Sequence, residues 1–152
     1  MLTPPSPHVT ITRVVVRPND MDADRNVSNA VYFDYFYQAR LEHLRRLGIY
    51  DVENPQYVNL FALVENTCRY LAHAYYGDVL ILWTATHAVG KSSFQFVYHV
   101  WRERDEMLIA LGHSVQVWLG ETSQAIPLPS AVCTALTTTL YPELSKPAAH
   151  KG

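Results

Sequence analysis

A polar stretch near the N-terminus carries the residues most able to do chemistry. Residues 19–36, NDMDADRNVSNAVYFDYF, place the carboxylates of Asp20, Asp22 and Asp24 at alternate positions and then continue into aromatic residues. Carboxylates at this spacing are compatible with three interpretations: a calcium loop, a catalytic loop, or a polar turn that starts a helix. The neighbouring residues separate these interpretations.

The calcium interpretation fails at two positions. An EF-hand loop needs a glycine at its sixth position, a bidentate Glu at its twelfth, and a helix on either side. Here those positions are Arg25 and Val31, and the preceding segment is typical of a strand. The polar-turn interpretation suits Asp20 and Asp24, because a helix dipole stabilises carboxylates near its N-terminus. For Asp22 the structural and the catalytic interpretation both stay open.

Length and composition indicate one globular domain over residues 1–152. Hydrophobic residues make up 49% of the chain and charged residues 17%, and the formal net charge is -2. Bulk charge therefore steers the protein neither to nucleic acid nor to an anionic membrane. Cys68 and Cys133 belong to no paired motif, which predicts a reduced, cytoplasmic setting with no disulfide framework and no metal site. We expect no signal peptide and no membrane span, because no suitable apolar run is present.

Hydrophobic periodicity predicts an α+β fold with a long central helix. Residues 8–17 are typical of a strand and residues 29–48 of a helix that is apolar nearly all round, capped by Ser28 or Asn29. A helix of that kind should be buried nearly all round. Further strands are expected at 57–72, 78–89, 93–104 and 106–119.

The connections between these strands are short, which favours antiparallel neighbours. One curled antiparallel sheet must then wrap around the helix, since no other element is available to cover it. Residues 1–7 are expected to be flexible. Residues 121–152 are expected to form a turn, a short helix and a tail.

Five segments, in order over roughly residues 8–140, resemble one known family. DMDADRNVSNAVYFDYFYQARLEHL is similar to the motif D-T-D-x-x-G-H-V-N-N-x-x-Y-x-x-Y-[FL]-x-x-A-R of the hotdog-fold acyl-CoA thioesterases, the 4-hydroxybenzoyl-CoA thioesterase-like family. The later segments that resemble this family are VENTCRYLAHAYYGDVL, VGKSSFQFVYHVW, ALGHSVQVWL and AIPLPSAV. Each segment alone is weak evidence, whereas five in order are strong. The resemblance implies the hotdog fold, a curled sheet around a central helix.

The resemblance implies a role for Asp22 as the catalytic carboxylate. It would attack the thioester carbonyl directly or act as a base on water, and the sequence does not choose between these. Unpaired backbone N–H groups at a helix start can bind an oxyanion, so Asn29 and Ala30 are the expected donors. Asn26 is expected to orient the carbonyl or the water.

Three departures from this family motif lie between Asp22 and Asn29. Arg25 replaces the usual Gly and restricts the loop, Asn26 replaces the usual His and cannot act as an acid or base, and Ser28 replaces an Asn. Some related enzymes carry the acid on the helix, which leaves Asp34 or Glu42 as alternative bases.

Six residues are candidate substrate contacts. The acyl group is expected along the helix, near Tyr32 and Phe36, and Glu65 is a further candidate contact. The turn that contains Lys91, Ser92 and Ser93 is expected to touch the phosphates of coenzyme A. A phosphate-binding P-loop is excluded there, because the required glycine five residues before Gly90 is absent. Residues 51–59 are expected to close one end of the acyl tunnel.

The sequence thus predicts an enzyme that hydrolyses acyl-CoA, with coenzyme A as part of the substrate and no metal or redox cofactor. Two alternatives stay open: release of an acyl or polyketide chain from an acyl carrier protein, and a non-catalytic hotdog module that only binds acyl ligands or oligomerises. The resemblance implies a homodimer or homotetramer. Aromatic residues suggest that one face of the sheet is covered, and exposed ones would indicate oligomerisation: Tyr75, Tyr76, Trp83, Trp101 and Trp118.

Overall fold

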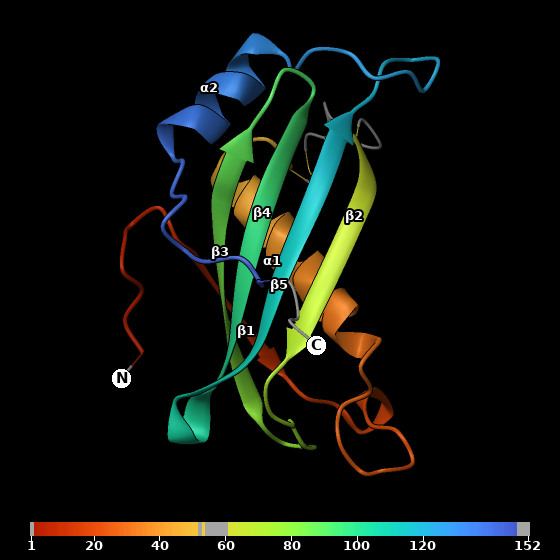
Figure 1. Ribbon diagram of the computed structural model, residues 1–152, viewed down its shortest axis with the longest axis vertical. Helices are drawn as coiled ribbons and strands as arrows, with labels where there is room; N and C mark the ends of the chain where they lie inside the picture. The colour runs from red at the N-terminus through yellow and green to blue at the C-terminus, as the bar shows by residue number, and fades with distance from the viewer. Residues whose placement is uncertain (1, 52, 54–60, 149–152) are drawn as a thin grey trace.

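The computed structural model describes residues 2–51, 53 and 61–148, and its centre is one antiparallel sheet curled around one long helix (Figure 1). The elements are β1 (Thr10–Val15), η1 (Pro18–Asp20), α1 (Val31–Arg46), β2 (Phe61–Tyr70), β3 (Val79–Val89), β4 (Ser93–Arg102), η2 (Glu103–Asp105), β5 (Met107–Trp118) and α2 (Ser130–Thr138). The five strands lie in the order β1-β3-β4-β5-β2. The predicted α+β architecture is confirmed, and each observed strand falls within a predicted segment.

One predicted pair of neighbours is wrong. A short segment, residues 71–78, joins β2 to β3, yet β2 pairs with β5 at the far edge of the sheet. The segment crosses the end of the sheet instead of turning back. Its backbone finds partners on the way, because the amide of Leu71 donates to the carbonyl of Ile109 and the amide of Val16 donates to the carbonyl of Asp78. These bonds replace those that a hairpin would supply.

α1 packs one face closely against the concave side of the sheet. The ring of Phe36 is fully buried and stacks on Tyr98, with 4.8 Å between ring centroids. A Cβ atom at Gly112 would lie 2.5 Å from the Phe36 ring, so only glycine allows the helix this close to β5. The prediction that the helix is buried nearly all round is wrong for the protomer, because the sheet covers one side of it. On the other side Tyr37 is 54% exposed.

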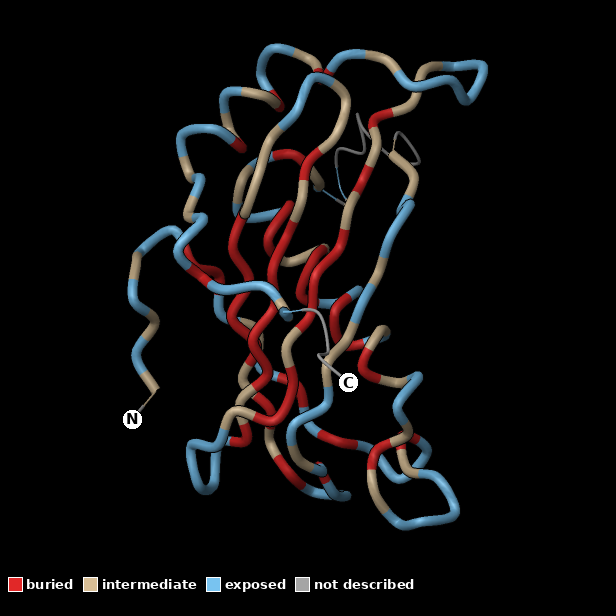
Figure 2. The backbone as a smooth tube through the Cα atoms, viewed as in Figure 1, coloured by how far each residue is buried: buried red, intermediate tan, exposed pale blue. Residues whose placement is uncertain are grey.

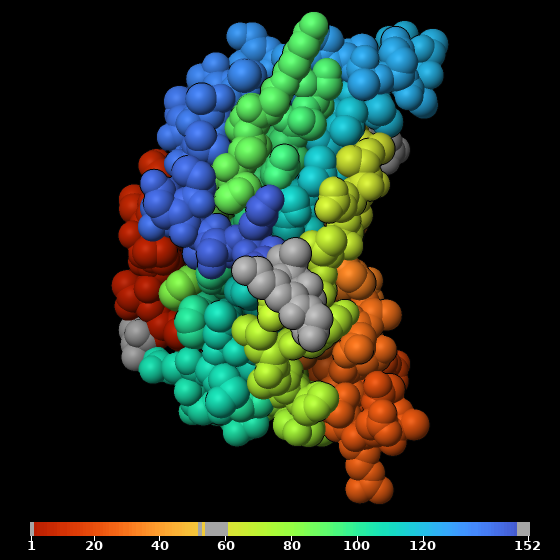
Figure 3. Space-filling view, in the orientation of Figure 1, coloured from red at the N-terminus to blue at the C-terminus, as the bar shows by residue number. Residues whose placement is uncertain are grey.

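The convex side of the sheet is covered in part by the chain's own terminal segments, of which the C-terminal one crosses the strands (Figures 2 and 3). Trp83 is only 8% exposed there, and Leu2, within the residues expected to be flexible, packs against the same cluster. Further along, a ring nitrogen of His99 lies 2.8 Å from the carbonyl oxygen of Ser145. The predicted cover of this face is therefore present, but much of it comes from the chain itself.

A buried histidine links α1 to two strands. His43 is fully buried, with Nδ1 2.6 Å from the hydroxyl of Thr10 in β1 and Nε2 2.9 Å from the hydroxyl of Thr86 in β3. Burial, and secondly the charge of Arg46, lower the pKa of His43 to about 3. The imidazole is therefore neutral in the folded protein over the ordinary pH range.

This burial predicts a pH-dependent stability. In the unfolded chain His43 becomes protonated below about pH 6.5, whereas in the folded chain it stays neutral until the pH nears about 3. The free energy of unfolding should therefore fall as the pH drops from about 6.5 to about 3. Above this range the contribution is complete. The slope from one group is at most about 1.4 kcal/mol per pH unit.

Urea unfolding of wild type and His43→Gln at about pH 4.5 and about pH 7.5 isolates this contribution, because the other acidic groups are common to both proteins. We expect wild type to lose more stability than His43→Gln between the two conditions. Equal losses would show that His43 is not the group responsible.

Candidate active site

The side chain of Asp20 fixes the polar loop to the helix. Its Oδ2 accepts the hydroxyl of Tyr35 at 2.8 Å and the amide of Arg17 at 2.9 Å, while its Oδ1 accepts the Arg17 guanidinium at 2.9 Å. Its own carbonyl accepts the amide of Ser28. Burial opposes the charge, but the hydrogen bonds from Arg17 and Tyr35 outweigh it and hold the pKa of Asp20 below its ordinary value. Asp20 is a structural residue, as the polar-turn interpretation predicts.

Asp22 lies in a small closed loop on the surface. Met21 and Val27 form an antiparallel bridge at the base of this loop, and the amide of Asp22 donates to the carbonyl of Asn26. The carboxylate of Asp22 is exposed, and one of its oxygens accepts the amide of Asp24 at 2.9 Å. Among the described residues, the other carboxylate oxygen has no hydrogen-bond partner, so it is open to a substrate or a water.

Arg25 keeps a glycine-like backbone in this loop. Its φ of 63° lies in the left-handed region, where a Cβ atom costs about 1–2 kcal/mol. The predicted restriction therefore takes the form of local strain, and the loop keeps the backbone turn that a glycine would make. The family motif has glycine at this position, and glycine would adopt the same left-handed backbone without strain.

The start of α1 opens onto a cavity of about 200 Å³. Its lining combines the loop, the helix and the crossing segment: Val27, Asn29, Tyr32, Tyr70, Leu71, Ala72 and His73. The helix begins at Val31 without a side-chain cap, so neither of the predicted caps acts as one. Within the described residues, no acceptor pairs with the amides of Asn29 or Ala30. These two donors are free to bind an anionic group.

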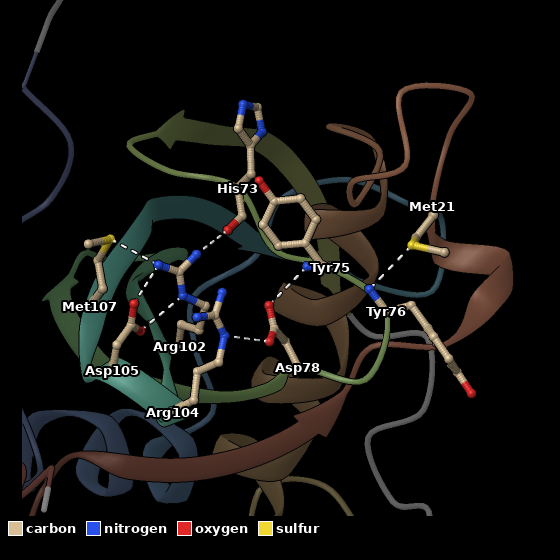
Figure 4. Close-up of polar contacts among 9 residues, drawn as sticks. All are labelled: Met21, His73, Tyr75, Tyr76, Asp78, Arg102, Arg104, Asp105 and Met107. Atoms are coloured by element: carbon tan, nitrogen blue, oxygen red, sulfur yellow. Dashed lines mark hydrogen bonds and ion pairs between the residues drawn. The ribbon is translucent and has the colours of Figure 1, made fainter.

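The crossing segment, residues 71–78, contributes its first three residues to the opposite wall of the cavity. Polar contacts hold the segment in place (Figure 4). Arg102 donates to the carbonyl of His73 at 2.6 Å, and the carboxylate of Asp105 holds the same guanidinium at 2.6 and 2.9 Å. In Figure 4 the imidazole of His73 projects away from this ion pair. A side chain on so fixed a backbone is well placed to act in a site.

The loop and the crossing segment lie side by side. The amide of Val27 donates to the carbonyl of Ala74 at 2.9 Å, and the amide of Tyr76 lies 3.2 Å from the sulfur of Met21. The carboxylate of Asp78 accepts the amide of Tyr75 and an ion pair from a neighbouring arginine (Figure 4). The site is thus built from two adjacent segments that hydrogen bonds connect along their length.

His73 is not among the residues that the sequence predicts for the site. The segment VENTCRYLAHAYYGDVL resembles a family motif that has a proline at the position of His73. This replacement was the one sign in the sequence that His73 could belong to the site. The chain therefore lacks the motif histidine at Asn26 but carries an imidazole on the wall that faces the helix start.

Several predicted substrate contacts lie elsewhere. Phe36 is in the core, whereas Tyr32 is on the cavity wall. Glu65 points to the outer face of β2, where it lines a groove with Arg69. Lys91 and its two serines form the β3–β4 turn, at the opposite end of the sheet, because the ten residues of β4 span roughly 30 Å. The protomer alone does not bring these residues together with Asp22.

Metal-binding clusters and membrane-spanning helices are both absent from the described part of the chain. Those residues contain no group of three metal-binding side chains and no helix long and apolar enough to cross a membrane. The predicted lid at residues 51–59 lies mostly outside the described residues.

Known proteins resemble this chain in sequence and in fold. Residues 16–136 match the model of the thioesterase-like superfamily. A gentisyl-coenzyme A thioesterase superposes with a TM-score of 0.73 at 26% identity, covering 84% of this chain and 99% of its own. A thioesterase from Thermus thermophilus, complexed with coenzyme A and Zn, superposes with a TM-score of 0.74 at 26% identity, covering 87% of this chain and 94% of its own. The described architecture is the hotdog fold of these neighbours.

A curated relative from Arabidopsis thaliana is a chloroplastic acyl-acyl carrier protein thioesterase. It is 24% identical over 117 residues, which is 77% of this chain. The chain spans 62% of the length of that relative.

The hydrogen bond from the Tyr35 hydroxyl to Asp20 predicts how much stability the protein loses when that hydroxyl is removed. Tyr35→Phe should lower the free energy of unfolding by about 1.5–3 kcal/mol, because a buried carboxylate loses a hydrogen-bond donor. Tyr37→Phe, on the exposed side of the same helix, is the matched control and should change it by less than about 0.5 kcal/mol. Urea unfolding measures both variants. Equal effects would mean that the Tyr35 hydroxyl does not stabilise the loop.

Proposed function

The chain belongs to the thioesterase-like superfamily, and we propose that it is an enzyme that hydrolyses acyl-coenzyme A to the free acid and coenzyme A. One observation carries the proposal: two unpaired amides, those of Asn29 and Ala30, stand at the start of α1 beside a cavity of about 200 Å³. Donors of this kind stabilise the negative charge that develops on a thioester oxygen during acyl transfer.

Asp22 supplies the second part of this chemistry. Its carboxylate either attacks the carbonyl carbon, so that water later hydrolyses the anhydride, or takes a proton from the attacking water. In both routes the carbon–sulfur bond breaks with its electron pair on sulfur, which leaves as the thiol after protonation. Water supplies the oxygen of the new acid. Asn26 orients the carbonyl or the water through its amide.

The exposed position of Asp22 supports a site shared between two protomers. Asp22 faces solvent and not the cavity of its own protomer, while β2 is a sheet edge that bears the exposed side chains of Leu63, Val64 and Tyr70. An edge strand with exposed apolar side chains favours pairing with another strand. We therefore include a homodimer, formed by two antiparallel β2 edges, in the proposal.

Such pairing would also account for the distant β3–β4 turn. Antiparallel edges place the Phe61 end of one β2 beside the Tyr70 end of the other, so the end of the sheet that carries Lys91 approaches the partner's site. Lys91, Ser92 and Ser93 could then contact the phosphates of coenzyme A, as the sequence predicts.

The carrier-protein alternative rests on the Arabidopsis relative. Acyl carrier proteins are acidic, so such an enzyme needs a basic patch at its site. The described residues that line the cavity include no Lys or Arg, but this does not separate the two carriers, because the phosphates of coenzyme A are also anionic. The two neighbours whose names include coenzyme A, both 26% identical to this chain, favour coenzyme A as the carrier. We place the reaction in the cytoplasm, in line with the free thiols of Cys68 and Cys133.

The activity test compares two neighbouring aspartates. Wild type, Asp22→Asn and Asp24→Asn are assayed for thiol release from benzoyl-, phenylacetyl-, hexanoyl- and palmitoyl-CoA, with an acyl carrier protein thioester alongside. We expect wild type to turn over at least one CoA ester and Asp22→Asn to lose about a hundredfold or more. Asp24→Asn should stay within about threefold of wild type. Binding without turnover by wild type would favour the non-catalytic alternative.

The dimer test compares the two sheet edges. Val64→Lys on β2 should give monomers and abolish turnover, because a charge in the pairing strand blocks the edge and the site needs two protomers. Val15→Lys on β1, at a similarly exposed position, is the matched control. Light scattering after size exclusion gives the mass, and the thiol assay gives the rate. An active Val64→Lys monomer would refute the shared site.

A further inference from the structure

We propose that Tyr70 is a positioning residue that sets the direction and strength of the Ala30 oxyanion donor. The hydroxyl of Tyr70 donates a hydrogen bond to the carbonyl oxygen of Asn29 at 2.6 Å. That carbonyl and the N–H of Ala30 belong to the same peptide group. The inference rests on the proposed function, since it concerns a donor of that site.

A planar peptide transmits this contact in two ways. Because the group is rigid, a bond that fixes its carbonyl also fixes the direction of its N–H. The same bond draws electron density toward the carbonyl oxygen, so the N–H becomes a stronger donor. Oxyanion donors act by being oriented before the charge develops, and Tyr70 supplies that orientation from outside the helix.

The surroundings of Tyr70 hold its hydroxyl in place. The residue pairs with Ala110 at the end of β2, and its ring packs edge-on against Tyr32 with 5.2 Å between centroids. Both rings line the cavity, so the hydroxyl joins the edge strand to the helix start across the site.

The protonation state of Tyr70 suits this role. Burial, and secondly the neighbouring Cys68, raise the pKa of the Tyr70 phenol above its ordinary value. The hydroxyl therefore keeps its proton, and remains a donor, throughout the neutral pH range.

The test removes one oxygen atom. Tyr70→Phe keeps the ring against Tyr32 and should lower kcat about tenfold while KM stays within about twofold, because the lost contact acts on the transition state. The fall is smaller than the roughly 10²–10³ lost with a direct oxyanion donor. Tyr76→Phe, an exposed tyrosine of the crossing segment, is the matched control and should keep the wild-type kcat.

A spectroscopic measurement separates positioning from structural damage. The carbonyl stretch of a bound, ¹³C-labelled ketone analogue of the acyl-CoA reports hydrogen bonding at the oxyanion site. It should move to higher frequency in Tyr70→Phe and stay unchanged in Tyr76→Phe. As a second variant, 3-fluorotyrosine at position 70 keeps the hydroxyl and should keep kcat at or above the wild-type value.

The outcomes distinguish this inference from the proposed function. If wild type is active and Tyr70→Phe keeps its kcat, or changes KM alone, or if fluorotyrosine lowers kcat as much as Phe does, Tyr70 has no positioning role and the proposed function stands. If wild type turns over no thioester, both proposals are wrong.

Discussion

The carboxylate of Asp20 is only 2% exposed, so it needs hydrogen-bond donors to offset the loss of water. These donors come from two directions. Arg17 approaches from the end of β1 and Tyr35 from the helix. The carbonyl of the same residue holds Ser28, just before the helix begins. These bonds hold both ends of the loop, so they limit how far the exposed carboxylate of Asp22 can move relative to the open amides at the helix start.

The second wall of the site depends on a different set of hydrogen bonds. Residues 71–78 cross the end of the sheet and take partners from β5, from Arg102 and from the loop itself. A connection without regular structure is thereby held in place by hydrogen bonds to three different parts of the fold. The imidazole of His73 and the hydroxyl of Tyr70 lie at this wall of the cavity. Movement of the backbone here would change their positions relative to a bound acyl group.

Much of the architecture follows from local patterns in the sequence. Alternation in β4 and the apolar periodicity of α1 specify the elements, and the motif around Asp22 specifies the loop. The strand order does not follow from local patterns, because the crossing at residues 71–78 depends on the carbonyl of Ile109 in β5, which lies far away in the chain. For the same reason the wall position of His73 could not be predicted. The outer cover of the sheet depends likewise on distant contacts, because residues of both chain ends pack against the same cluster on β3 and β4.

The strand order also bears on the sequence of folding events. β3, β4 and β5 are joined by short turns and can pair as soon as each is formed. β2 precedes them in the chain, yet its partner is β5, the last strand to appear. The loop closed by that pairing is long, which delays its formation relative to the local hairpins. The edge that carries Tyr70 therefore docks late, and the cavity at the helix start is completed only once β5 is in place.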